Sequence, residues 1–522
     1  MSGRLYRESL PRRFARVVEA NADRPAVLFN EDEALSYREL DKLSNQVARY
    51  LGARGVRAGQ RVAFRLEKSP AAYAIVLGCL KSGVTYFAVD PSTPEARLKS
   101  MFEQCPPSLI FAETTDKLDA FKDKVVPCPG GKAAFCADQE TADVDAHHGP
   151  SLSDAAYVMF TSGSTGAPKG AVITHANLHY FVDWAVNEYG FFPGERHTHI
   201  NPIYFDNSVF DMYSTFFSGG TLVPFTSALL QDPYGVVERI DKMKCEVFFS
   251  VPSMLIFLQT TKAIEKGAVP SLRKIIFGGE GYPKTKLAEL FECVGAHARL
   301  INVYGPTECT CICSSYTLGA DDFKNLDGYP PIGALTSPFS YYLLDGDRAV
   351  AVGEVGELCL GGPCVGHGYF NQPELTRKSF VQNPLNAAFE ERLYRSGDLL
   401  RLDPKDGKLW FVGRKDFQVK HQGYRIELEE IQHGLAKIEG VEEACVVQAF
   451  ESGASRLIGY VASHKALNAD HLRKAVAEYV PKYMVPAQIF VVERLPKNAN
   501  GKTDRKQLLA LYESGDAVKE KA

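Results

Sequence analysis

Short runs of β-branched and aromatic residues alternate with longer amphipathic stretches along most of the chain. RVAFRL is followed by SPAAYAIVLGCLKSG and then by VTYFAV, and CEVFFSV is later followed by PSMLIFLQTTKAIEK. A short apolar run suits a buried strand, and a longer amphipathic stretch suits a helix that covers a sheet. The alternation therefore predicts an α/β fold, built from β-α units around largely parallel sheets.

The chain is expected to form a large and a small domain, because 522 residues, 45% of them hydrophobic, exceed one typical domain. Near residue 413 the pattern changes, and KLWFVGRKDFQVKHQGYRIELEEI indicates a strand, a charged turn, a second strand and the start of a helix. The α+β pattern that follows has a length suited to an independent unit. We predict a large N-terminal domain of β-α layered sheets over 1–413 and a small mobile α+β C-terminal domain over 414–522.

The charge pattern excludes several classes of partner. A formal net charge of −4, with both signs interspersed, gives no reason to expect nucleic acid. No apolar run approaches the roughly 18 to 20 residues that span a bilayer, and the first residues lack the apolar core of a signal peptide. The 12 cysteines are scattered through apolar stretches. We expect a cytoplasmic protein with reduced thiols and with neither nucleic acid nor membrane as a partner.

Three cysteines, Cys309, Cys311 and Cys313, alternate in YGPTECTCICSS. Alternate residues of a strand share one face, so a metal site is one interpretation. However, the paired C-x2-4-C spacing of zinc sites is absent, and no further His or Cys group follows at ligand distance. We interpret the three residues as strand or pocket-lining residues.

The segment TSGSTGAPKG (161–170) follows the apolar run YVMF and predicts a phosphate-binding loop. Its three glycines and four hydroxyl-bearing residues allow backbone N–H groups to surround an anion, and Lys169 adds a positive charge. Gly166 is followed by Ala-Pro-Lys-Gly, so the segment does not match the P-loop pattern. A plain Gly/Ser turn is the alternative.

Ten motifs in unbroken order make the chain similar to a known superfamily. They are LSYREL (35–40), LKSGVTYFAVDP (80–91), TSGSTGAPKG (161–170), FDNSVFDM (205–212), NVYGPTE (302–308), GELCLGG (356–362), YRSGDL (394–399), GRKDFQVKHQGYRIELEEI (413–431), PKYMVP (481–486) and NGKTDRK (500–506). The chain resembles the adenylate-forming superfamily of acyl-CoA synthetases, luciferases and nonribosomal-peptide-synthetase adenylation domains. It is most similar to the last branch, as a stand-alone adenylation enzyme.

The resemblance implies that ATP and Mg2+ bind to these motifs. The loop from Thr161 to Lys169 would hold the β- and γ-phosphates, Thr307 and Glu308 would lie at the α-phosphate, and Glu308 would hold a Mg2+ that arrives with ATP. Tyr304 would stack on adenine, Asn302 would bond its edge, and Asp398 would accept both ribose hydroxyls. The full predicted ATP set is Thr161, Ser162, Gly163, Ser164, Thr165, Gly166, Lys169, Gly279, Glu280, Asn302, Tyr304, Thr307, Asp398 and Arg414. Taken singly, Tyr304 also fits a core aromatic residue, Asp398 a turn and Glu308 a surface charge.

The small domain is expected to supply one catalytic side chain. Lys502 resembles the lysine that enters the active site and stabilises charge on the substrate carboxylate and phosphate, and it completes a catalytic set with Thr307, Glu308 and Lys169. A solvated lysine is the alternative. In this superfamily the small domain swings about a hinge, which Asp416 matches. Gly423 matches the position where a pantetheine arm passes close to the backbone, although a turn glycine also fits.

Asp206 favours an amino acid as the substrate. An aspartate at this position pairs with the substrate ammonium in amino-acid-activating members, and fatty- and aryl-acid members generally lack it. A carboxylate removed from water needs a cation. A helix N-cap is the alternative. The other predicted substrate residues are Asn207, Phe210, Ser250, Ile276, Gly278, Val303, Cys311, Ile312 and Lys502.

The predicted pocket suits a small to medium neutral side chain. Gly278 is expected to add room on one wall, Phe210 to close another, and Asn207 and Ser250 to offer hydrogen bonds. FDNSVFDM and FFSVPSMLIFL also resemble D-alanine:carrier-protein ligases. Those enzymes carry a bulkier residue where this chain has Gly278, so D-alanine is an open alternative.

The resemblance implies that the acyl group passes from the adenylate to a pantetheine thiol. Only 20 residues follow Lys502, too few for a carrier domain, so we expect a discrete phosphopantetheinylated carrier protein as the partner. An acyl- or aryl-CoA ligase and a non-catalytic protein of the same fold are the alternatives. Asp206 argues against the first, and the intact charged motif residues argue against the second.

Overall fold

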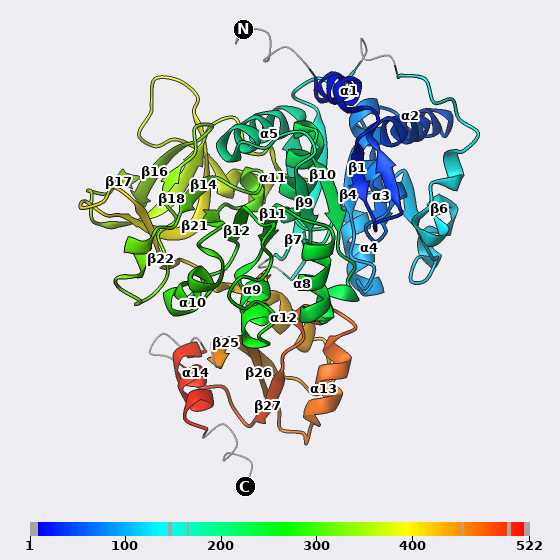
Figure 1. Ribbon diagram of the computed structural model, residues 1–522. Helices are drawn as coiled ribbons and strands as arrows, with labels where there is room; N and C mark the ends of the chain where they lie inside the picture. The colour runs from blue at the N-terminus through cyan, green and yellow to red at the C-terminus, as the bar shows by residue number, and fades with distance from the viewer. Residues whose placement is uncertain (1–8, 145–148, 164–165, 452–453, 498–502, 516–522) are drawn as a thin grey trace. The chain divides into compact units, whose positions relative to one another are not determined.

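The computed structural model describes residues 9–144, 149–163, 166–451, 454–497 and 503–515. The chain separates into two compact units (Figure 1). The first consists of Met1–Pro91, Cys105–Phe160 and Gly170–Lys415, and the second of Ser92–Gln104, Thr161–Lys169 and Asp416–Ala522. The division after Lys415 lies close to the predicted limit at 413, and two short segments of the N-terminal half belong to the second unit.

A nine-stranded sheet in the first unit has the order β15-β14-β13-β12-β11-β9-β10-β1-β2. Its strands are β1 (Pro25–Leu28), β2 (Ala34–Ser36), β9 (Arg196–His199), β10 (Thr221–Pro224), β11 (Val247–Ser250), β12 (Lys274–Gly278), β13 (Arg299–Tyr304), β14 (Ser314–Thr317) and β15 (Ala334–Leu335). Five neighbouring strands of this order, β10, β9, β11, β12 and β13, pair in parallel. Strands β10 to β13 are rich in apolar residues because both faces of the sheet are covered, whereas β9 has the polar sequence Arg-His-Thr-His.

Three helices cover one face of this sheet (Figure 1). They are α8 (Pro233–Lys242), α9 (Pro252–Thr260) and α10 (Lys284–Val294). Ile240, Leu258 and Leu290 of these helices share a buried core with Phe248 and Ile275 of the sheet. The β-α alternation of the sequence is confirmed here.

A seven-stranded sheet in the same unit has the order β19-β8-β7-β4-β3-β5-β6. Its strands are β3 (Arg61–Arg65), β4 (Thr85–Ala88), β5 (Leu109–Ala112), β6 (Val125–Pro127), β7 (Ala155–Thr161), β8 (Lys169–Thr174) and β19 (Gly368–Tyr369). Helices α1 (Leu10–Asn21), α2 (Tyr37–Ala53), α3 (Pro70–Ser82) and α5 (His175–Tyr189) pack with it. Ser36 and Glu39 form a capping box that fixes the start of α2.

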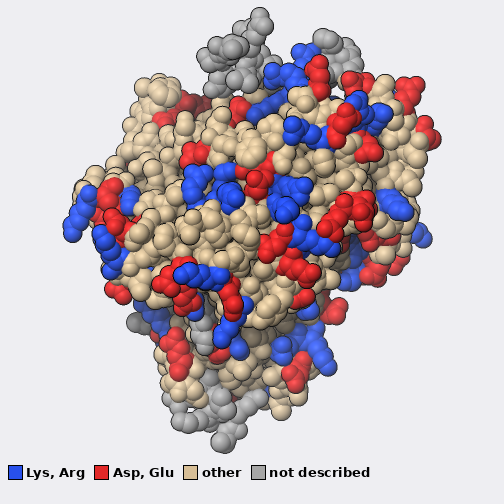
Figure 2. All heavy atoms as spheres, in the orientation of Figure 1, with Lys and Arg blue, Asp and Glu red and all other residues tan. Residues whose placement is uncertain are grey.

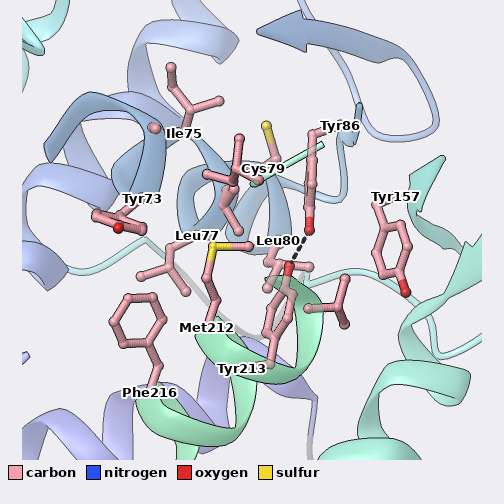
Figure 3. Close-up of a cluster of buried hydrophobic side chains, with 14 of the residues drawn as sticks. Tyr73, Ile75, Leu77, Cys79, Leu80, Tyr86, Tyr157, Met212, Tyr213 and Phe216 are labelled. Atoms are coloured by element: carbon pink, nitrogen blue, oxygen red, sulfur yellow. Dashed lines mark hydrogen bonds between the residues drawn. The ribbon is translucent and has the colours of Figure 1, made fainter. Parts of the chain in front are cut away.

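Helix α3 is apolar on all sides, as expected for a helix inside a core. It is buried from Ala71 to Leu80, within one core that also holds residues of both large sheets. Figure 3 shows its side chains against Met212, Tyr213 and Phe216. These residues belong to a continuous helical segment made of α6 (Asn207–Val209), the π-helical turn η6 (Phe210–Ser214) and α7 (Thr215–Ser218).

A third sheet of the first unit is antiparallel, with the order β17-β16-β18-β21-β20 and with β22 paired to β21. Its elements, with one adjoining helix, are β16 (Ser340–Asp345), β17 (Arg348–Ala349), β18 (Val355–Gly361), α11 (Pro373–Ser379), β20 (Phe380–Gln382), β21 (Arg392–Leu402) and β22 (Leu409–Arg414). Its buried face packs with Tyr304, Cys309 and Cys313, so this sheet lies beside the carboxyl end of β13.

The second unit has an α+β architecture. Its elements are α4 (Glu95–Gln104), β23 (Gln418–His421), β24 (Tyr424–Glu427), α12 (Leu428–Leu435), β25 (Glu443–Glu451), β26 (Ala454–Ala462), α13 (Ala469–Val476), β27 (Gln488–Val492) and α14 (Arg505–Glu513). Val446 and Leu457 pack with α12 and α13, whereas Val447 and Tyr460 pack with Leu508 of α14. The three-stranded sheet β25-β26-β27 is therefore covered on both faces (Figure 1).

The surface carries both signs of charge. On the face shown in Figure 2, Lys and Arg side chains alternate with Asp and Glu, in agreement with the small net charge. Within the described part of the chain, no helix has the length and hydropathy needed to cross a membrane.

Candidate active site

The candidate site of the first unit gathers where parallel strands end. Ser250 closes β11, Gly278 closes β12 and Tyr304 closes β13. The turn η8 (Thr307–Cys309) follows β13 directly. Ligands of open α/β sheets bind outside the carboxyl ends of the strands, so this edge is where a substrate is expected.

Asp206 is linked to this edge by a hydrogen bond. The hydroxyl of Thr307 donates to Asp206 Oδ2 at 2.6 Å, which joins the FDNSVFDM and YGPTE motifs. Asp206 occupies the N-cap position of α6, but its side chain makes no capping hydrogen bond. The alternative of a helix N-cap is therefore not supported. The turn η6 that follows is π-helical, a distortion that is frequent at functional sites.

Apolar side chains surround this end of the helical segment. The predicted residues Phe210, Ile276, Val303 and Ile312 are buried in one core. The ring of Phe210 lies with its centroid 4.8 Å from that of Phe249. These four predicted residues thus belong to the large core that the two sheets share, with Phe210 on Phe249 of β11.

The three alternating cysteines were predicted to be strand or pocket-lining residues, and the strand interpretation is wrong because β14 begins only at Ser314. Cys309 lies in η8, and the next two residues, Thr310 and Cys311, have φ values of 57° and 77° in the left-handed region. Backbone in that region is costly for residues with a Cβ and clusters at functional sites. Cys311 Sγ lies 3.8 Å from Asn207 Oδ1, which agrees with a pocket-lining role. Among the residues that the structure describes, no metal-binding group of three His, Cys, Asp or Glu exists.

The prediction that Gly278 adds room to the pocket is wrong. A Cβ at this position would lie 2.2 Å from the carbonyl oxygen of Val303 and 2.7 Å from its Cγ2. The space is therefore filled by the backbone of β13, and the glycine permits the close approach of two strands.

Replacing Gly278 with alanine is expected to lower the free energy of unfolding by about 1 to 3 kcal/mol, the usual cost of overpacking. The obstacle is a backbone atom, which cannot rotate away. Gly319→Ala is the matched control, because nothing lies within 4 Å of a Cβ there. Denaturant unfolding measures both, and equal stability of the two variants would contradict the prediction.

A buried polar cluster lies beside Tyr304. The Tyr304 hydroxyl and the Arg414 guanidinium donate to the two carboxylate oxygens of Asp398. Asp398 and Arg414 face each other across β21 and β22, so Asp398 lies in a strand and not in a turn. Burial and the nearby Asp398 raise the pKa of Tyr304 well above its usual value. Asn302 donates its side-chain amide to the carbonyl of Pro331 at 2.9 Å.

Glu308 is fully buried, which excludes the alternative of a surface charge. The hydroxyl of Tyr369 donates to Glu308 Oε1 at 2.7 Å. No motif predicted a role for Tyr369, which lies 61 residues after Glu308 in the chain. Mg2+ binds through one or two carboxylates together with substrate phosphates, so a buried glutamate at this edge fits such an ion.

Two further predicted nucleotide residues have local structural roles. Gly279 has a φ of 92°, in the left-handed region, which accounts for glycine at this turn. The Glu280 carboxylate accepts from the backbone N–H of Ser253 at 3.1 Å, in the first turn of α9.

The glycine-rich loop belongs to the second unit in this structure. The Ser162 hydroxyl donates to Arg425 O at 2.7 Å and accepts from Glu427 N at 3.0 Å. Gly163 N donates to Glu430 Oε2 at 3.3 Å, and Lys169 Nζ lies 3.7 Å from Glu427 Oε1. The Gly163 N–H and the Lys169 ammonium group thus face carboxylates, whereas the Ser162 hydroxyl donates to a backbone carbonyl. The hydroxyl of Thr161 donates to Lys169 O at 3.5 Å, which joins the two ends of the loop. Gly166 has a φ of 81°, in the left-handed region. Ser164 and Thr165 lie outside the described residues.

The predicted hinge and pantetheine residues lie at the start of the second unit. Asp416 is its first residue after the division at Lys415, and its carboxylate accepts from Gln418 N at 3.3 Å. Gln422 and Gly423, with φ values of 51° and 85°, form the two-residue turn between β23 and β24. Such a turn favours glycine at its second position, so turn geometry alone accounts for Gly423. Lys502 lies outside the described residues.

The fold and this arrangement define an enzyme of the adenylate-forming class. The AMP-binding enzyme family model matches residues 14–370, and the model of the AMP-binding enzyme C-terminal domain matches residues 430–502. The chain therefore belongs to the AMP-binding enzyme family.

Similar proteins include adenylation enzymes of the nonribosomal-peptide-synthetase type. Bacitracin synthase 3 of Bacillus licheniformis is 34% identical over 496 residues, which are 95% of this chain and 8% of that protein. The L-proline--[L-prolyl-carrier protein] ligase of Pseudomonas fluorescens is 32% identical, over 93% of this chain and 96% of that protein. The chain thus spans a small part of the large synthases and nearly all of the ligase.

A solved structure has the same fold. The structure of holo-PA1221, an NRPS protein containing adenylation and PCP domains, superimposes with a TM-score of 0.82 at 25% identity, covering 97% of this chain and 85% of that chain.

Proposed function

We propose that this protein activates an amino acid with ATP as its aminoacyl-AMP and transfers the aminoacyl group to the phosphopantetheine thiol of a separate carrier protein. The observation that carries the proposal is the hydrogen bond from Thr307 to Asp206. It places a carboxylate able to bind an ammonium group next to a residue of the proposed α-phosphate site. The similarity to a proline carrier-protein ligase over nearly its whole length supports the same reaction type.

The first step needs alignment and charge stabilisation rather than a base, because a substrate carboxylate is already ionised at neutral pH. One carboxylate oxygen attacks the α-phosphorus of ATP, and pyrophosphate leaves. Asp206 would hold the ammonium group, Asp398 the ribose and Tyr304 the adenine, while Lys169 would neutralise phosphate charge. Glu308 would hold a Mg2+ ion, which would further neutralise the negative charge of the phosphates.

In the second step the pantetheine thiol attacks the acyl carbon of the adenylate, and AMP leaves as the new thioester forms. Asp416 is the proposed hinge between the conformations for the two steps, and Gly423 the proposed passage for the pantetheine arm. D-alanine is one candidate amino acid, and the cytoplasm is the proposed location.

Amino-acid-dependent exchange of labelled pyrophosphate into ATP tests the proposal, over a panel of L-, D- and non-protein amino acids. Exchange with one or a few of them is expected, followed by thioester formation on a phosphopantetheinylated carrier protein. No exchange with any member, or thioester formation with CoA alone, would contradict the proposal.

Replacing Lys502 with alanine is expected to lower the rate of adenylate formation by about 100- to 1,000-fold, as for the loss of one group that stabilises developing charge. The affinity for ATP should change much less, because the other nucleotide residues remain. Lys506→Ala, an exposed lysine of α14, is the matched control. Exchange at the wild-type rate in the Lys502 variant would refute the assignment.

A further inference from the structure

Asp211 is a carboxylate buried in the helical segment that begins after Asp206. It lies in the π-helical turn η6 and is 2% exposed, between Phe210 and Met212 of the large apolar core. Burial raises the pKa of its carboxyl well above the usual range, and the hydrogen bond from Asn201 opposes this shift only in part. A carboxylate is costly to place inside a core, so this residue calls for an explanation beyond packing.

The side chain of Asp211 is bound to the carboxyl edge of the nine-stranded sheet. Asn201 follows β9 and is 3% exposed. Its side-chain amide donates to Asp211 Oδ2 at 2.9 Å and to the carbonyl of Phe249 in β11 at 3.0 Å. The ring of Phe210, the neighbour of Asp211 in the chain, packs on the ring of Phe249. One amide group therefore links the helical segment to two adjacent strands.

The connection that carries Asn201 is itself fixed. The ammonium group of Lys68 donates to the carbonyls of His199 and Ile200, each at 2.7 Å, and to that of Phe225 at 2.9 Å. His199 ends β9, and Phe225 follows β10. Three acceptors match the three N–H groups of an ammonium, so the backbone directly before Asn201 has little freedom to move.

Asp206 lies at the beginning of the segment that Asp211 anchors. Its carboxylate accepts from Thr307, which follows β13, at 2.6 Å. Further along the same segment, the hydroxyl of Tyr213 lies 2.7 Å from that of Tyr86 in the other large sheet (Figure 3). A helix moves largely as one piece because its backbone is bonded internally. Releasing Asp211 from the sheet edge would therefore let Asp206 shift.

We propose that Asp211 is a positioning residue, which through its hydrogen bond to Asn201 holds Asp206 where it binds the ammonium group of the amino acid. This inference rests on the proposed function. Hydrogen bonds to the ammonium group weaken steeply when distance or angle is wrong. A misplacement of about 1 Å can lower a rate by about 100-fold even when the changed residue does not touch the substrate.

The test compares the amino acid found by pyrophosphate exchange with its deamino analogue, which lacks only the ammonium group. The ratio of the two kcat/KM values measures recognition of that group. In Asp211→Leu the ratio should fall by about 10- to 100-fold, chiefly through a higher KM for the amino acid. Asp211→Asn should retain most of it, because its amide oxygen can still accept from Asn201. A loss of stability alone would lower both values alike and leave the ratio unchanged.

Thr215→Val is the matched control. The hydroxyl of Thr215 donates to the carbonyl of Asp211 at 2.6 Å, a buried hydrogen bond inside the helical segment that links it to neither sheet. This variant should lower the melting temperature and keep the ratio. Asn201→Ala removes the donor and should act like Asp211→Leu. The two changes together should lower the ratio no further than the larger single effect, because both break one bond.

An unchanged ratio in Asp211→Leu or in Asn201→Ala, or an equal fall in Thr215→Val, would overturn this inference alone. Failure of both Asp211→Leu and Asn201→Ala to fold would make the bond a requirement of folding, which would overturn the inference as well. Absence of exchange with every amino acid in the wild type would overturn the proposed function and this inference with it.

Discussion

Replacing Asp206 with alanine should raise the KM for the amino acid by about 1,000-fold or more, because truncating one partner of a desolvated charge pair costs several kcal/mol. In the occupied site the ammonium group would otherwise be out of water without a counterion. The hydroxyl of Thr307 would also lose its acceptor. Pyrophosphate exchange at varied amino acid concentration measures the effect.

A deamino analogue of the substrate is the control for this prediction. It has the same side chain and carboxylate but no ammonium group, and it should be a poor substrate for the wild-type enzyme. The Asp206 variant should treat the amino acid and the analogue alike. Its ATP affinity should fall much less than its affinity for the amino acid, because only Thr307 of the proposed ATP residues contacts Asp206 through a hydrogen bond described here. Discrimination that survives in the variant would place the ammonium site elsewhere.

The fold was predictable because its signals are local. Alternating strand and helix patterns, such as RVAFRL before SPAAYAIVLGCLKSG, correspond to β3 and α3 in the structure. The change of pattern near residue 413 corresponds to a division after Lys415. Each of these features depends on neighbouring residues, which a single sequence contains.

The contacts of the site were not predictable in the same way. Thr307 and Asp206 are far apart in the sequence, as are Glu308 and Tyr369, so no local pattern announces either hydrogen bond. The left-handed backbone at Thr310 and Cys311 defeated the strand interpretation of the cysteines, because neither residue favours that conformation. The prediction for Gly278 is wrong for a related reason: the residue that a Cβ there would meet is Val303, which lies on another strand. The motifs identified the site residues, but the contacts that these residues make could be described only from the three-dimensional fold.

Replacing Asp398 with leucine should lower the free energy of unfolding by about 3 to 5 kcal/mol, the usual cost of breaking a buried ion pair. The change leaves Arg414 opposite an apolar side chain and removes the acceptor of the Tyr304 hydroxyl. The side chains of Asp398 and Arg414 are 6% and 12% exposed, so water compensates little. ATP affinity should fall as well, because the proposed ribose acceptor is gone. Thermal unfolding and nucleotide titration measure the two effects.

A double variant separates the two roles of Asp398. Asp398→Leu combined with Arg414→Met replaces the ion pair by apolar side chains, which commonly restores stability. Binding of ATP should stay about 10- to 100-fold weaker than in the wild type, as expected from the loss of charge-assisted hydrogen bonds. Since Arg414 is also a proposed nucleotide residue, ATP titration of Arg414→Met alone measures its share of this loss. If stability and ATP affinity both recovered, Asp398 would be a structural residue only, and the ribose would have to bind elsewhere. If neither recovered, with Arg414→Met alone stable, the loss would lie in the packing around Tyr304 rather than in the unpaired charge.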